Sequence, residues 1–219
     1  MRNHFKKYAL LLIAGLVICS MSCEKDSKGG GEGGFIINAR NIIIDGNDSN
    51  IAAVKAIMWN RQSGEDEPIA TGTYENGRFK LTLPNTIDDC YLDKASNLGG
   101  RWRYISNPNV KMGEICYISA YNEADNEIGS FGYFESRDTS ATYVYADRSV
   151  TITGSYDGRE GIFIYDCSLK KGWNVVYYIS WGEDEDEDYR YHTLTTKKPS
   201  NITLKWHYHG WGKSSATKK

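Results

Sequence analysis

The chain has 219 residues with 26 basic and 28 acidic side chains, so its formal net charge is −2. No basic stripe is dense enough to neutralise a phosphate backbone, which excludes a nucleic-acid partner. The residues from Phe35 to Lys219 are numerous enough to bury one sizeable core.

The amino terminus combines a basic start with a short apolar run. Three basic residues precede apolar residues 8–18, and the small Ser22 stands directly before Cys23. The apolar run is too short to span a bilayer, so we expect the segment to insert transiently and to be cut. This arrangement resembles a lipobox. The resemblance implies a signal peptide over residues 1–22, acyl chains on the sulfur of Cys23 and a stable membrane tether.

Two other interpretations of the amino terminus fit less well. Modification of Cys19 would place the bulky Ile18 where the peptidase needs a small residue. An uncleaved anchor helix would need roughly 20 apolar residues, and the flanking sequence does not supply them. Removal of residues 1–22 takes away three basic and no acidic side chains, which lowers the net charge from −2 to −5.

Residues 23–34 are charged and then rich in glycine, with no large apolar side chain to bury. This composition is typical of a flexible linker that lifts a domain clear of lipid headgroups. Its start, Cys23-Glu24-Lys25-Asp26, resembles the signal that sends lipoproteins of Bacteroides-type bacteria to the outer cell surface. The resemblance implies a lipid-anchored protein of the outer membrane that faces outward.

From Phe35 onward, short runs rich in Val, Ile, Thr and Tyr alternate with clusters of Gly, Asn and Asp, which is typical of β-strands. The predicted strands are Phe35–Ile44, Val54–Trp59, Pro68–Tyr74, Arg78–Leu83, Glu114–Tyr121, Glu127–Phe134, Ala141–Tyr145, Val150–Tyr156, Ile162–Leu169, Trp173–Trp181, Tyr189–Thr196 and Ile202–His209. Glu75-Asn76-Gly77 and Lys170-Lys171-Gly172 are each predicted to join two strands as a tight hairpin. The irregular stretch Thr86–Asn109 is predicted to be the longest loop, with one helical turn near Asp88–Ala95.

This number of short strands predicts an all-β fold with an antiparallel β-sandwich over residues 35–219. The sandwich is either one domain or two packed β subdomains, over 35–105 and 106–212. A lipocalin-like barrel is the alternative.

Two further resemblances agree with an all-β fold. The segments Ile69–Tyr74 and Gly77–Pro84 resemble the strand-turn-strand of transthyretin-like β-sandwiches, where this motif is structural. The segments Tyr143–Gly154, Leu169–Tyr177 and Thr195–Ser200 are similar to uncharacterised Bacteroides-type surface lipoproteins. That family implies a cellular address and a β fold, and it carries no catalytic residues over to this chain.

Aromatic side chains are the main candidates for a binding role, because flat rings contact sugar faces and partner proteins well. Most of them alternate on predicted strands, which is typical of a core face. The residues predicted to point inward are Trp173, Val175, Tyr177, Ile179 and Trp181 on one strand, and Ile202, Leu204, Trp206 and Tyr208 on the last strand.

The aromatic residues outside those strands are the candidate ligand platform. Trp102 lies between Arg101 and Arg103, beside Tyr104, in the least regular part of the chain. Trp211 follows the last predicted strand. Loops can expose such rings, so these five residues are the predicted binding site. The alternative is that they cover loops over the core.

Metal binding and thiol catalysis have weaker support. His207 and His209 share a strand face, and His192 could lie on a neighbouring strand, but this face is the one expected to meet solvent. The acidic runs Glu183–Asp188 and Asp45–Asn50 are more typical of solvated hairpin tips than of calcium loops. No metal or cofactor is therefore expected.

The cysteines of the domain also suggest a structural role. Cys90, Cys116 and Cys167 allow at most one disulfide, and no histidine lies close in sequence to activate any of them. Cys167 is expected to be buried, since it shares a strand face with apolar residues.

The sequence thus predicts a lipid-anchored, non-catalytic β module on the outer cell surface that binds a glycan or protein partner or serves in an envelope assembly. The alternative is a hydrolase of surface polysaccharides. Carboxylates are numerous enough to supply a glycosidase pair, but no spacing selects one.

Overall fold

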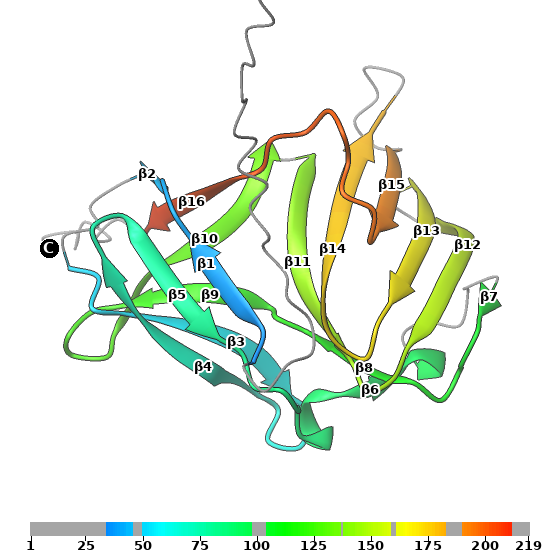
Figure 1. Cartoon of the computed structure of the whole chain (residues 1–219), viewed down its shortest axis with the longest axis horizontal. Coiled ribbons are helices and arrows are strands. Elements are labelled where there is room, and N and C mark those ends of the chain that lie inside the picture. Colours follow the sequence, from blue (N-terminus) through cyan, green and yellow to red (C-terminus); the bar gives the residue numbers. More distant parts are fainter. Residues whose placement is uncertain are drawn as a thin grey trace, which may run out of the picture.

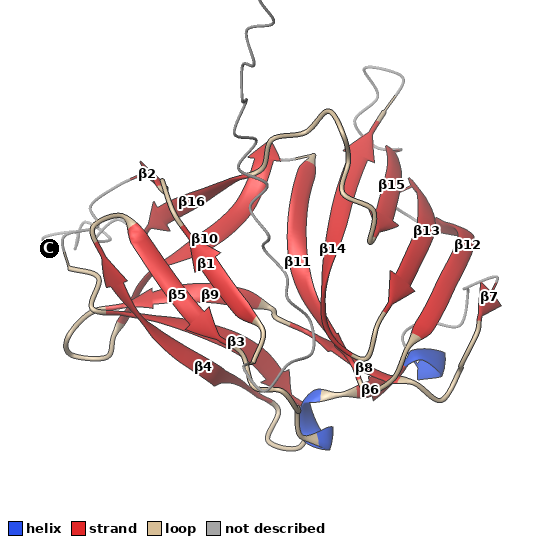
Figure 2. Cartoon of the chain, in the orientation of Figure 1, coloured by secondary structure: helices blue, strands red, loops and turns tan. Residues whose placement is uncertain are grey.

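The computed structural model describes residues 34–45, 50–97, 104–136, 138–158, 161–182 and 190–211. Within these ranges the regular secondary structure is almost entirely β-strand (Figure 2). The helical segments there are two short 3₁₀ turns, η1 (Asp89–Tyr91) and η2 (Ala95–Asn97). The strands are β1 (Ile36–Ala39), β2 (Ile43–Asp45), β3 (Ala53–Asn60), β4 (Glu65–Glu75), β5 (Arg78–Thr82), β6 (Asp93–Lys94), β7 (Tyr104–Ile105), β8 (Lys111–Glu114), β9 (Tyr117–Tyr121), β10 (Glu127–Ser136), β11 (Thr139–Ala146), β12 (Val150–Gly158), β13 (Gly161–Leu169), β14 (Gly172–Trp181), β15 (Arg190–Thr195) and β16 (Lys205–Gly210). The predicted all-β class is confirmed.

The strands form one large, mostly antiparallel sheet. Its order is β1-β5-β4-β3-β9-β10-β11-β14-β15-β13-β12-β7, and β16 and β8 branch from β10 and β11 to pair with β2 and β6 (Figure 1). The pairs β13–β15 and β16–β2 are parallel. The path ends at β1 and β7 without closing, so the lipocalin-like barrel alternative is wrong.

The first part of the sheet folds back so that β5 packs face to face on β10 and β16. The ring of Phe79 on β5 lies 4.8 Å from that of Phe131 and 5.0 Å from that of Trp206, centroid to centroid. Trp206 and Tyr208 are buried as predicted, and Leu204 just before them is buried too. We call this cluster core 1, and its buried members include Ile37, Val54, Met58, Phe79, Leu81, Leu83, Ile118, Phe131, Tyr143, Tyr145, Trp173, Trp206 and Tyr208.

A second cluster, core 2, lies on the other face of the sheet, over β11 to β12. Its buried members are Ala95, Val110, Met112, Val144, Ala146, Val150, Ile152, Cys167, Leu169 and Val176. Strand β11 serves both clusters, because side chains alternate along a strand. Tyr143 and Tyr145 point into core 1, whereas Val144 and Ala146 point into core 2.

Two predicted strands are interrupted where the chain changes partner. Asn41 adopts a left-handed backbone with φ 54° and separates β1, which pairs with β5, from β2, which pairs with β16. Ile115 donates its backbone N–H to Tyr143 and Cys116 donates to Ile57, which separates β8 from β9. Alternation in the sequence cannot reveal such breaks, since the residues on both sides still favour strands.

One predicted hairpin is confirmed and the other is wrong. Asn76 and Gly77 have φ of 50° and 72° and join β4 to β5 in a two-residue turn, as the Asn-Gly pair indicates. Residues 170–172 join β13 to β14, but these strands do not pair. Strand β15 lies between them, parallel to β13 and antiparallel to β14 (Figure 1).

The prediction for Trp181 is also wrong. Trp173 at the start of β14 is buried in core 1, and Val175 packs against that core. Trp181 at the far end of the same face is 44% exposed and stacks on Tyr191, with ring centroids 4.4 Å apart. Strand β14 is longer than core 1, so its last residues leave the core although the alternation continues.

Candidate functional site

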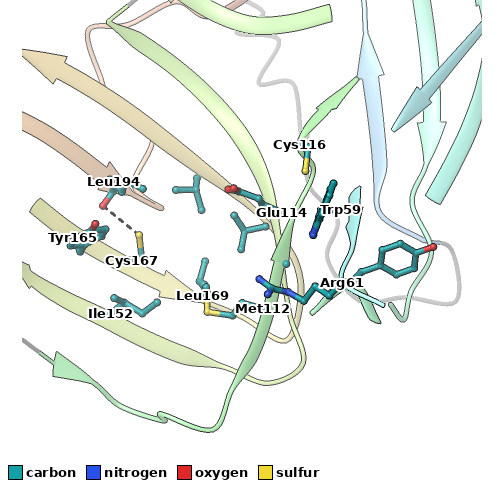
Figure 3. Close-up of a pocket in the computed structure, with 14 residues that line it drawn as sticks. Trp59, Arg61, Met112, Glu114, Cys116, Ile152, Tyr165, Cys167, Leu169 and Leu194 are labelled. Carbon is teal, nitrogen blue, oxygen red and sulfur yellow. Dashed lines mark hydrogen bonds between the residues drawn. The ribbon is translucent and has the colours of Figure 1, made fainter. Parts of the chain in front are cut away.

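A pocket of about 340 Å³ lies on the core 2 face of the sheet. Strand β8 forms its centre, because Glu114 and Met112 pair with Val144 and Ala146 of β11 and so share one face of the sheet. Gly113 of β8 and Cys116 just after it also line the pocket. The remaining lining comes from β3 and the turn after it, from η1, and from β12 to β15: Trp59, Arg61, Tyr91, Ile152, Tyr165, Cys167, Leu169, Val176 and Leu194. Figure 3 shows Trp59 and Arg61 on one side and Tyr165, Cys167 and Leu194 on the other.

Gly113 allows the segment around η1 to approach β8 closely. A Cβ atom at this position would lie 2.5 Å from the carbonyl oxygen of Tyr91 and 2.7 Å from Cε of Met58. Such contacts are too short for any side chain, so glycine is required here. This close approach brings β3 and η1 against the sheet of core 2 and thereby forms the second wall of the pocket.

The turn after β3 holds Arg61 at the pocket. The side-chain oxygen of Asn60 accepts hydrogen bonds from the backbone of Gln62 at 2.8 Å and of Ser63 at 3.2 Å. The N–H of Arg61 donates to the carbonyl of Cys90 at 2.8 Å, which ties the turn to η1. The guanidinium Nη1 of Arg61 lies 2.8 Å from Oδ2 of Asp93, so its charge is already paired.

Glu114 is the acidic residue of the described pocket lining. Its side chain is exposed at the pocket, and partial desolvation by neighbouring protein atoms raises the pKa of its carboxyl. It forms no hydrogen bond or ion pair with the part of the chain that the structure describes. Its charge, when present, is therefore uncompensated in a mainly apolar pocket.

Trp59 offers an available ring at the same pocket. It lies near the end of β3 and is 47% exposed, and its ring stacks on no other ring among the described residues. Two other rings are already stacked: Trp181, which is 44% exposed, stacks on Tyr191, and the partly buried Phe134 stacks on His207 with centroids 4.0 Å apart. A ring already stacked has one face fewer for a ligand.

The hydroxyl and thiol groups of the lining are poorly suited to nucleophilic chemistry. Tyr91 donates to Oε2 of Glu67 at 2.7 Å, and this bond, together with burial, raises the pKa of Tyr91 to about 12. Desolvation raises the pKa of the Cys116 thiol, and it raises the pKa of the Cys167 thiol to about 11. Raised thiol pKa values leave little thiolate at neutral pH. Cys167 is buried, as predicted, and its Sγ donates to the carbonyl of Leu194 at 3.3 Å.

The predicted aromatic platform is only partly within the described residues. Arg101, Trp102 and Arg103 lie outside them, as does Cys23. Tyr104 on β7 is 57% exposed and Trp211 after β16 is 56% exposed. Strands β7 and β16 lie in opposite halves of the molecule (Figure 1), so Tyr104 and Trp211 do not share one surface.

The three histidines considered as metal ligands are not brought together. His207 and His209 lie on β16 beside Phe134, and desolvation lowers the pKa of His207. His192 lies on β15, which does not pair with β16, and it stacks between Phe163 and Tyr178. Among residues 34–45, 50–97, 104–136, 138–158, 161–182 and 190–211 no group of three His, Cys, Asp or Glu could hold a metal ion. The acidic run 183–188 and most of 45–50 fall outside these ranges.

Sequence reasoning missed the pocket residues Trp59, Arg61 and Glu114. Glu114 was expected merely to begin a strand that continued to Tyr121. One signal was present in the sequence: Met112, Glu114 and Cys116 alternate, which places an acidic residue on an otherwise apolar face. No local sequence pattern indicates that Trp59 and Arg61 line this pocket, because they lie about 50 positions before Glu114 in the chain.

Comparisons with family models, with curated proteins and with solved structures found no match. In the part of the chain that the structure describes, no helix is long and apolar enough to cross a membrane.

Proposed function

We propose that this protein is a lipid-anchored, non-catalytic binding module displayed on the outer cell surface, and that it holds a small ligand, or a protruding group of an envelope glycan or protein, in the pocket beside Trp59. The pocket carries the proposal. It combines an apolar wall, an available indole ring and one uncompensated carboxyl group. Few polar groups in a mainly apolar concavity are the usual composition of a ligand site.

The chemistry of the pocket favours binding over polysaccharide hydrolysis. A glycosidase needs two carboxyl groups facing each other across the substrate, about 5 to 9.5 Å apart. The described lining supplies Glu114 as its one carboxyl group, and the raised thiol pKa values do not provide an alternative nucleophile. The pocket of about 340 Å³ is near the lower end of the range of about 300 to 1,000 Å³ that is common for ligand cavities. It is therefore small for an oligosaccharide.

A matched pair of tryptophan variants tests the binding site. We expect Trp59→Ala to weaken binding of pocket ligands at least about tenfold, because stacking on an aromatic ring contributes about 1–3 kcal/mol. Trp181→Ala is the control, since Trp181 is 44% exposed, close to the 47% of Trp59, but lies away from the pocket. Ligands would come from a thermal-shift screen of glycan fragments and small amphiphiles, with affinities from calorimetry. Equal losses in both variants, or a loss only in Trp102→Ala, would contradict the assignment.

The membrane anchor and the outward display rest on residues 1–34 and are tested separately. We expect Cys23→Ala to abolish incorporation of radiolabelled fatty acid into the protein and to release it from the membrane fraction, because the sulfur of Cys23 carries the acyl chains. Protease added to intact cells should digest the native protein. Complete protection until the envelope is opened would show that the domain faces the periplasm.

A further inference from the structure

The pocket has a negative electrostatic balance. Arg61 and Asp93 neutralise each other, with Nη1 and Oδ2 2.8 Å apart, whereas Glu114 has no partner among the described residues. An ionised Glu114 therefore leaves one negative charge facing the cavity. Glu114 is exposed at the pocket and partial desolvation disfavours its ionised form, so a ligand that supplies the missing positive charge is favoured over a neutral or negative one.

The surrounding rings and apolar side chains fit the remainder of such a ligand. Trp59 presents an indole that can attract a cation through its π-face. Leu169, Leu194 and Ile152 contribute apolar side chains to the pocket wall away from Trp59 (Figure 3). A polar sugar would leave most of this wall without a suitable contact.

We propose that the pocket binds a small amphiphilic amine, whose protonated nitrogen pairs with Glu114 and whose apolar body packs against Leu169 and Leu194. This inference rests on the proposed function, since it names the ligand class of the same pocket. A volume of about 340 Å³ accommodates one ring or a short alkyl chain rather than a polymer. The amine can be free or can be a group on a larger envelope molecule.

Pairing also has a thermodynamic advantage at this position. Desolvation at the pocket disfavours the ionised form of Glu114. A bound ammonium group favours that form and adds a charge-assisted hydrogen bond. A carboxylate ligand would instead meet a like charge.

Three probes of nearly equal size and shape test the inference: 3-phenylpropylamine, 3-phenylpropan-1-ol and 3-phenylpropanoate. Binding to the mature protein would be measured by calorimetry at about pH 7.5, where the amine is protonated. We expect the amine to bind at least about tenfold more tightly than the alcohol, and the carboxylate to bind most weakly, because hydrogen bonds to charged groups contribute about 1.5–3 kcal/mol.

Glu114→Gln should weaken amine binding at least about tenfold and leave the affinity for the alcohol within about twofold. Glu123→Gln is the matched control, since Glu123 is exposed in a turn outside the pocket, and it should change neither affinity. Near-ultraviolet circular dichroism would establish that each variant is folded. If Glu114→Gln proves unfolded, the ranking of the three probes on the native protein decides the question alone.

The outcomes separate the two proposals. Binding of all three probes with similar affinity, or amine binding that is unchanged by Glu114→Gln, would overturn the amine assignment and leave the pocket as a ligand site. Failure of all three probes to bind, in native protein that is folded, would overturn the amine assignment. The Trp59→Ala comparison would then decide separately whether the pocket binds any ligand.

Discussion

Glu114 is the residue on which the proposed binding function depends most. Its carboxyl group lies at a mainly apolar pocket without a partner among the described residues, and partial desolvation there makes its ionised form less stable than in water. Natural proteins accept such local costs mainly at functional sites.

This cost predicts a pH dependence. Partial desolvation raises the pKa of Glu114 above its ordinary value of 4.5, whereas the unfolded chain keeps the ordinary value. Well below pH 4.5 Glu114 is protonated in both states and no stability is lost. As the pH rises from 4.5 through the folded-state pKa, the unfolded chain releases its proton more readily, so the free energy of unfolding falls.

Glu114→Gln removes this titration. We therefore expect the stability of the variant relative to the native protein to increase between about pH 4.5 and about pH 7, as measured by urea denaturation at fixed pH values. The other titratable groups of the pocket lining, Arg61, Tyr91, Cys116, Tyr165 and Cys167, are common to both proteins, so the difference isolates Glu114. A difference that stays constant with pH would show that the pKa of Glu114 is not raised.

At the scale of elements, β15 is inserted between β13 and β14, two strands that are consecutive in the chain. The two outer strands are joined by residues 170–172, and β15 fills the space that opens between them. Two contacts hold β15 in place where β13 and β14 converge. Lys197 pairs with Asp166 at 2.8 Å, and Thr196 accepts a hydrogen bond from the N–H of Ser168 at 3.0 Å.

Gly161 permits the parallel pairing of β13 with β15 at the other end of β15. It has φ 131°, and a Cβ atom there would clash with the carbonyl of Arg190 on β15. We expect Gly161→Ala to lower the free energy of unfolding by about 1–3 kcal/mol more than Gly172→Ala does. Gly172 is the control because it also has positive φ, at 93°, but a Cβ atom added there would meet no atom within 4 Å. Equal losses in chemical denaturation would show that backbone strain alone matters at Gly161.

At the scale of the molecule, two cores share a single sheet. Strand β11 sends Tyr143 and Tyr145 into core 1 and sends Val144 and Ala146 into core 2. Loss of either core would therefore remove support from a strand that the other core needs. The pocket depends on this arrangement, since Trp59 belongs to the half with core 1 and Leu194 packs against core 2.

The shared strand predicts cooperative unfolding. We expect Phe131→Ala in core 1 and Ile152→Ala in core 2 to destabilise the protein by about 2–5 kcal/mol each and to lower the midpoint of one common transition. Calorimetry together with tryptophan fluorescence would measure this. Two resolved transitions, each sensitive to only one variant, would show that the cores unfold independently.

Local sequence was sufficient to predict the all-β class, the location of most strands and the turn at Asn76-Gly77. These properties depend on alternation and on backbone preferences within a few residues, and the observed φ angles of 50° and 72° agree with them. The burial of Trp206 and Tyr208 follows from the same local alternation.

Only the three-dimensional fold revealed three other features: which strands pair, where the alternation of a strand extends beyond the core, and which segments assemble the pocket. The turn at Lys170–Gly172 looks like a hairpin locally, yet β15 competes successfully for the edges of both flanking strands. Trp181 continues the inward pattern of β14 but extends beyond core 1. Glu114 and Trp59 meet at one cavity because Gly113 lets distant segments approach. Contacts between residues far apart in the chain set all three, and local patterns carry no information about them.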